Sequence, residues 1–212
     1  MKIRILLFLT TLFIAAAAII FSASLLFHKE YYGSDFGIEN YISPFDADGD
    51  GIDDQTDILE SAKIYISAKP KYKSKYYADG YPDDEYGVCT DVVAFALKNA
   101  GYDLRELVNA DIISNPEKYD IETRDKNIDF RRVKNLNVYF KNIAASLTVD
   151  LSDIGDWQGG DIVVFKNHIG IVSDKRNRKG IPFLIHHSGT MQLKYEEDVL
   201  ESYEIVSHYR AG

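Results

Sequence analysis

The sequence has little cysteine and no excess of positive charge. Cys89 is the one cysteine, so the chain cannot form an internal disulfide, and this residue must serve packing or reactivity. The chain carries 24 basic and 33 acidic side chains, a formal charge of −9, which argues against nucleic acid as a partner. It has no internal repeat and no long linker rich in proline, glycine or serine, so we expect one domain after the N-terminal region.

The N-terminal region has the pattern of an export signal or a membrane anchor. Lys2 and Arg4 precede an uncharged apolar run of 23 residues, 5–27, and about 20 such residues span a bilayer as a helix. We predict that residues 1–27 are an uncleaved signal anchor with the two basic residues on the cytoplasmic side. Small residues at 15–18 and 22–24 leave cleavage and secretion as the alternative. Both readings place the remaining chain outside the cytoplasm.

Apolar spacing indicates helices in the first half of the chain. We interpret residues 28–45 as a tether, and the apolar residues from Ile58 to Ile66 indicate a helix that Pro70 ends. A second helix has an apolar face between Val92 and Ala100, and Gly101 closes it. Residues 71–88 and 103–134 look like loop or irregular structure, and a further helix is expected around 136–143.

Short β-rich runs follow Trp157. Strands are expected at 161–165, 168–173, 183–188 and 203–209, each bounded by turn residues. Helices followed by strands predict an α+β fold with an antiparallel sheet.

Cys89 stands where the second helix should begin. Unpaired N–H groups and the helix dipole at such a position lower the pKa of a thiol, which favours the nucleophilic thiolate. The same N–H groups can hold the oxyanion formed when sulfur attacks a carbonyl. Cys89 is therefore a candidate nucleophile, with a buried packing role as the alternative.

Histidines on two neighbouring predicted strands supply candidates for the base. His168 opens one strand, and His186 on the next is placed to hydrogen-bond its ring and fix its tautomer. His187 competes for this third role, because adjacent strand residues point to opposite faces and only one of the two can face His168.

The segment from Trp157 to Phe165, followed by His168 to Val172, resembles the strand pair "GDLVFF … HVGIY" of the NlpC-type cell-wall cysteine peptidases. The strings GYPDDEYGVCTDVV, NIDFRRVKNL and HIGIVSD, with the closing HYR, resemble a bacterial family named domain of unknown function 1287, over roughly residues 45–210. Typical superfamily members have Asp before the cysteine and Ser-Gly after it, whereas this chain has Val88 and then Thr90-Asp91.

The resemblance implies a papain-like fold, with the cysteine helix packed on an antiparallel sheet, and hydrolysis of amide bonds in peptidoglycan peptides. Position by position it implies Cys89 as nucleophile, His168 as base and His186, rather than His187, as the orienting residue. We expect residues 58–212 to form this hydrolase domain.

Four further residues are candidates for contacts with substrate. Tyr81 and Tyr86 precede the cysteine, where a phenolic O–H would reach an oxyanion, although 15 tyrosines make chance placement common. Arg131 and Arg132 have the geometry to clamp a substrate carboxylate, and surface ion pairing is the alternative.

Residues 46–57 have the spacing of a calcium loop. Asp46, Asp48, Asp50, Asp54 and Asp57 occupy positions 1, 3, 5, 9 and 12, Gly51 occupies position 6, and Ile52 would offer its carbonyl. The loop resembles the DxDGDGIxD repeats of thrombospondin type 3, in one copy. We predict a structural Ca²⁺ of modest affinity and no organic cofactor; a solvated acidic turn is the alternative.

The leading hypothesis is an extracytoplasmic cysteine peptidase or amidase that acts on cell-wall peptide or another acyl or amide substrate. Two alternatives are a calcium-dependent cell-surface binding module in which Cys89 is a core residue, and a thiol-dependent acyltransferase. Product analysis separates the hydrolase from the transferase.

Overall fold

The computed structural model describes residue 13 and residues 29–211. The chain divides into two compact units, residues 1–30 and residues 31–212. The predicted anchor, residues 1–27, lies outside the described residues apart from Phe13. In the part of the chain that the structure describes, no helix is both long and apolar enough to cross a bilayer.

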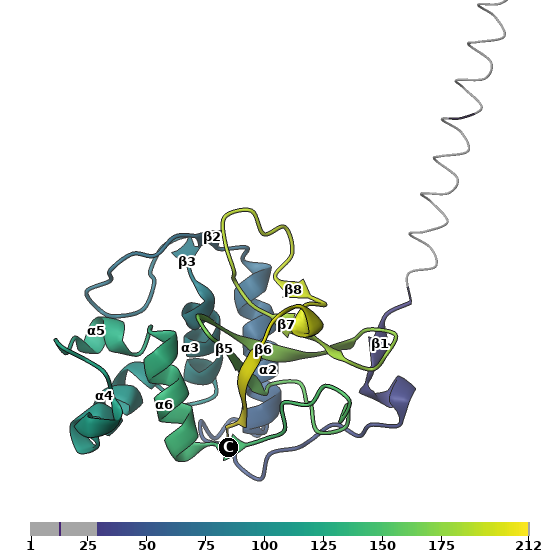
Figure 1. Cartoon of the computed structure of the whole chain (residues 1–212), viewed down its shortest axis with the longest axis horizontal. Coiled ribbons are helices and arrows are strands. Elements are labelled where there is room, and N and C mark those ends of the chain that lie inside the picture. Colours follow the sequence, from purple (N-terminus) through teal and green to yellow (C-terminus); the bar gives the residue numbers. More distant parts are fainter. Residues whose placement is uncertain (1–12, 14–28, 212) are drawn as a thin grey trace, which may run out of the picture. The chain divides into compact units, whose positions relative to one another are not determined.

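The second unit is a mixed α+β domain built on an antiparallel sheet, as the sequence predicted (Figure 1). The seven-stranded sheet has the order β4-β9-β5-β6-β7-β8, and β1 also pairs with β6. Its strands are β1 (Tyr31–Tyr32), β4 (Ala145–Ser146), β5 (Ile162–Phe165), β6 (His168–Arg176), β7 (Pro182–Ile185), β8 (Glu196–Glu197) and β9 (Ile205–Arg210).

The helices are α2 (Asp54–Ser67), α3 (Cys89–Asn99), α4 (Leu104–Ser114), α5 (Lys126–Asp129) and α6 (Val133–Ile143). Helices α2 and α3 pack on each other, and α3 packs on β6. Strands β2 (Lys71–Tyr72) and β3 (Tyr86–Gly87) form a separate parallel pair, and β3 lies directly before α3.

Successive side chains of a strand point to opposite faces of the sheet. Both faces of the central strands are buried, since each packs against a different apolar cluster. Ile162 and Val164 of β5 belong to the core that also contains the apolar faces of the helices. Val163 and Phe165 belong to a second cluster with Trp157. Strand β5 thus holds β6, which begins at His168, between two packed layers.

The region that we expected to be irregular, 103–134, contains α4. Asp103 caps this helix by accepting a hydrogen bond from the N–H of Arg105, and Leu104, Val108 and Ile112 are buried at intervals of four residues. This spacing is typical of a helix, but the segment is mostly polar, and we therefore predicted irregular structure there.

Part of the expected tether, residues 28–45, belongs to the second unit and contacts its sheet. Tyr31 and Tyr32 pair with Arg176 and Lys175 of β6, and the N–H of Tyr41 donates to the side chain of Gln158 at 3.1 Å. Apolar spacing could not predict this pairing, because a two-residue strand is too short to show a period.

Candidate functional site

Helix α3 begins at Cys89, and its first turn is fixed by charged side chains. Val88, at the N-cap, cannot cap with its own side chain, so the carboxylate of Asp91 accepts the N–H of Val88 at 2.8 Å. Arg131 donates to both oxygens of Asp91, at 2.7 and 2.8 Å, and this ion pair is buried. Asp91 thus has a local structural role at the start of α3.

A glycine allows a close approach just before the cysteine. A Cβ on Gly87 would lie 2.1 Å from the hydroxyl of Tyr65, so no side chain fits there without displacing that ring. Gly87 pairs with Tyr72 of β2. Burial raises the pKa of Tyr72, and the charge of an ionised Cys89 acts in the same direction, which places Tyr72 near the thiol.

The thiol of Cys89 is less acidic than the start of a helix predicts. Burial raises its pKa to about 11, while backbone N–H groups of Ile169, Thr90 and Cys89 itself act to lower it. Desolvation therefore outweighs the helix N-terminus, and the thiol is protonated at neutral pH. Cys89 is counted among the buried residues, with 9% of its surface exposed.

The ring of His168 hydrogen-bonds the ring of His186. The two atoms, Nε2 of His168 and Nδ1 of His186, are 2.8 Å apart. Ile171 and Val172 pair with Ile185 and Leu184, which sets Gly170 opposite His186 and puts the two histidines on a diagonal. A Cβ on Gly170 would lie 2.8 Å from the carbonyl of Ile185, so glycine is needed for this close pairing.

Both histidines are neutral at ordinary pH. Burial lowers the pKa of each to about 4, and neighbouring histidines add to the effect, His186 and His187 for the first ring and His187 for the second. Within residues 29–211, no hydrogen bond joins the thiol of Cys89 to His168. The thiol does lie beside the N–H of Ile169, the residue that follows His168.

His187 lies near the two rings but is not hydrogen-bonded to either of them. Its ring packs edge-on against Tyr72 and Tyr195, with ring centroids 5.2 and 5.1 Å away. Its Nδ1 is buried and has no hydrogen-bond partner among the described residues. The residue paired with His168 is therefore His186.

Three of the four candidate substrate contacts have internal partners. The hydroxyl of Tyr81 donates to Asp103 at 2.8 Å, which turns it away from a role as oxyanion donor. Arg131 is buried against Asp91 and is not free to clamp a carboxylate. Arg132 is half-exposed, and its Nε lies 3.9 Å from Oδ1 of Asp129. It therefore takes part in an ion pair, which was the alternative to a substrate contact. Tyr86 is partly buried in β3, with Lys73 and Lys75 over its ring.

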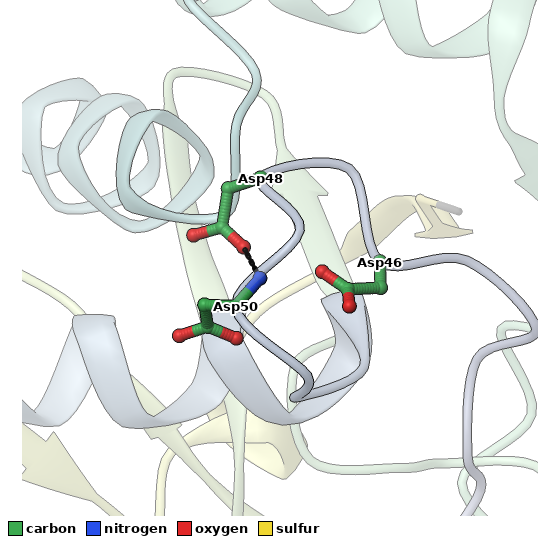
Figure 2. A group of neighbouring side chains, drawn as sticks. All are labelled: Asp46, Asp48 and Asp50. Carbon is green, nitrogen blue, oxygen red and sulfur yellow. Dashed lines mark hydrogen bonds between the residues drawn. The ribbon is translucent and has the colours of Figure 1, made fainter.

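The aspartate loop brings three carboxylates together. Asp46, Asp48 and Asp50 each offer an oxygen within 4.8 Å of the others, on the turn before α2 (Figure 2). Gly49 and Gly51 have φ values of 77° and 95°, which favour glycine, and both N–H groups donate to Asp46. Ile52 lies in the same turn, and its N–H donates to Asp50 at 2.8 Å.

Asp57 fits this group and Asp54 does not. Burial, then the carboxylates of Asp50, Asp48 and Asp46, raise the pKa of Asp57 to about 6, and its Oδ2 is buried with no partner among the described residues. Asp54 is fully buried and uses both oxygens, accepting from the N–H of Ala47 and from the hydroxyl of Tyr102. The predicted ligand role of Asp54 is thus corrected: it anchors the loop.

Sequence reasoning missed two neighbours of the site, Tyr72 and Glu197. Oε2 of Glu197 lies 3.1 Å from Nε2 of His186, within hydrogen-bond distance. It lies in the two-residue strand β8, which has no periodic signal, and Tyr72 lies in a basic run that looked like loop.

Comparisons with known proteins support one family. The family model described as Domain of unknown function (DUF1287) matches residues 59–211. Uncharacterized protein YijF of Escherichia coli (strain K12) is 39% identical over 150 residues, which cover 66% of this chain and 72% of that protein. No solved structure matches the chain. The chain therefore belongs to the family of the domain of unknown function 1287.

Proposed function

We propose that this protein is a cysteine peptidase or amidase of papain-like fold that cleaves amide bonds in cell-wall peptides. The observation that carries the proposal is the placement of Cys89, at the start of α3, beside the first residues of β6, where His168 is bonded to His186. A cysteine helix packed on an antiparallel sheet is the arrangement that the papain-like reading requires.

The proposed reaction starts from a neutral thiol and a neutral imidazole. The sulfur of Cys89 attacks the carbonyl carbon while its proton passes to Nδ1 of His168, the ring nitrogen that His186 leaves unused. The N–H of Cys89 stabilises the oxyanion. The tetrahedral intermediate then expels the amine, which takes the proton from His168, and water activated by His168 hydrolyses the thioester.

The location of the reaction is also a proposal. Lys2 and Arg4 before the apolar run 5–27 support a domain held outside the cytoplasm at the membrane, or secreted after cleavage. A reporter enzyme that is active only after export, fused behind residue 30, should be active. An inactive but stable fusion would refute this location.

The direct test of the reaction is turnover of muropeptides by the purified full chain. Cys89→Ala should lower turnover at least about 100-fold, since it removes the nucleophile. Cys89→Ser, which keeps the shape of the site, controls for packing. Mass spectrometry of the products distinguishes a free acid, from hydrolysis, from an acyl group carried to an amine. Unchanged turnover by Cys89→Ala would refute the proposal.

We further propose that the aspartate loop binds one structural Ca²⁺. The convergence of Asp46, Asp48 and Asp50, with the unpartnered oxygen of Asp57, supports this donor set of carboxylates. The ion would offset the mutual repulsion of these groups and hold the loop that leads into α2.

Calcium should therefore stabilise the protein. With a Kd of roughly 10⁻⁴ to 10⁻³ M, about 10 mM calcium should add about 1–3 kcal/mol to the free energy of unfolding. Asp48→Asn should abolish this increase in a thermal melt, whereas Asp79→Asn, an exposed aspartate outside the loop, should keep it. An equal calcium effect in both variants would refute the site.

A further inference from the structure

The hydrogen bonds that start at His168 continue past His186 to a carboxylate. Glu197 of β8 pairs with Leu184 of β7, two residues before His186, so both side chains lie on the same face. Oε2 of Glu197 is 3.1 Å from Nε2 of His186. His186 is 1% exposed, whereas about a third of the Glu197 side chain is exposed.

The hydrogen bonds of Gln192 show that Glu197 accepts a hydrogen bond and does not donate one. The backbone N–H of Ser188 donates to Oε1 of Gln192 at 2.7 Å, so the other amide atom of Gln192 must be its NH₂ group. That group donates to Oε2 of Glu197 at 3.1 Å and to the carbonyl of His186 at 3.2 Å. Glu197 is therefore held as an acceptor.

An accepting carboxylate fixes the protons on both rings. Glu197 requires hydrogen on Nε2 of His186, and the neutral ring then has a lone pair on Nδ1. That lone pair accepts from Nε2–H of His168 over the 2.8 Å contact. The neutral ring of His168 is left with its lone pair on Nδ1, the nitrogen needed to take a proton.

We propose that Glu197 is a positioning residue: by accepting from His186, it sets the tautomers of both histidines and leaves Nδ1 of His168 unprotonated, the nitrogen that takes the proton of Cys89 in the proposed reaction. This inference rests on the proposed function and extends the pair of histidines to a chain of three groups. The effect is transmitted through His186, so Glu197 itself need not touch substrate.

The neighbouring carboxylate provides a matched control. Glu196, one residue earlier on β8, accepts from the hydroxyl of Ser173 and pairs with Lys175 at 3.2 Å. It has the same charge and strand but no contact with either ring. An effect of charge or of β8 alone would be the same for both glutamates.

The tautomers can be measured directly. Long-range ¹H–¹⁵N spectra of the full chain, with its five histidines assigned by substitution, report which ring nitrogen holds the proton. In the wild type, both rings should carry hydrogen on Nε2. In Glu197→Ala a second tautomer should appear for His186 and His168, and alkylation of Cys89 by iodoacetamide at neutral pH should slow about tenfold. Glu197→Gln, which retains an acceptor oxygen, should restore much of the rate, and Glu196→Gln should match the wild type.

Hydrogen on Nδ1 of His168 in the wild type would overturn the inference. Unchanged tautomers and alkylation in Glu197→Ala would also overturn it, as would equal losses in Glu197→Ala and Glu196→Gln. Neither readout uses muropeptides, so a failure of the proposed hydrolysis and a failure of this inference give different results.

Discussion

Two histidine–carboxylate clusters among the described residues differ in how they end. In the first, His208 bonds the carbonyl of Thr148 at 2.7 Å and Asp161 at 3.0 Å, and its ring stacks on Trp157. Asp161 also accepts two bonds from Arg210, both of 2.8 Å. Every ring nitrogen and carboxylate oxygen in this closed cluster has a protein partner.

In the second cluster, the chain from Glu197 through His186 stops at His168. Nε2 of His168 is bonded, and Nδ1 has no hydrogen bond within residues 29–211. A closed cluster can only hold the structure together, whereas an open-ended chain keeps one atom for chemistry. Similar residues thus serve stability in one place and, by our proposal, proton transfer in the other.

The largest expected effect is on stability. Asp161→Ala should cost about 3–5 kcal/mol of unfolding free energy, because it leaves the charge of Arg210 and the ring of His208 unpaired in the interior. Glu197→Ala, at a partly exposed carboxylate, should cost about 1 kcal/mol or less. Urea unfolding of the two variants measures the difference, and similar losses would remove the distinction between the clusters.

The next largest expected effect is on activity, and it distinguishes His186 from His208. His186→Ala should lower muropeptide turnover about 100-fold, since His168 loses its orienting partner. His208→Ala should lower stability but leave turnover per folded molecule unchanged. The fraction of folded protein, from the unfolding curves, corrects both rates. Equal corrected rates for the two variants would contradict a special role for the open chain.

A smaller effect again is expected at Gly170. A methyl group there meets the carbonyl of Ile185 and the Cβ of His186, so Gly170→Ala should cost about 1–3 kcal/mol and displace His186. Gly155→Ala, where no heavy atom lies within 4 Å of an added Cβ, is the control. Thermal melts and turnover are the measurements. Normal turnover in Gly170→Ala would show that the diagonal pair tolerates displacement.

Sequence patterns were sufficient for elements with a long period. The helix that starts at Cys89 and the strand that starts at His168 were predicted because their apolar residues recur at the spacing of a buried face. The two-residue strands that carry Tyr72 and Glu197 have no such period. Their position depends on contacts with distant parts of the chain.

The chemistry of single residues was harder to predict than their position. The effect of a helix N-terminus on Cys89 is local and can be read from sequence, but the burial that raises its pKa comes from tertiary packing. Arg131 looked like a substrate clamp because nothing in the sequence shows that Asp91, 40 residues away, neutralises it. Asp54 likewise fits the calcium spacing, and only the fold directs it to Ala47.

The most direct test of the central claim is the rate of Cys89 alkylation by iodoacetamide as a function of pH, in the wild type and in His168→Ala. The pKa of His168 is lowered to about 4, so its base form persists as pH falls from neutral and is lost only near pH 4. We predict that the wild-type protein keeps a His168-dependent rate below neutral pH that is lost only near pH 4. The rate of His168→Ala should be lower and should follow thiol ionisation alone, rising with pH toward about 11. Identical profiles for the two proteins would contradict the pairing of Cys89 with His168.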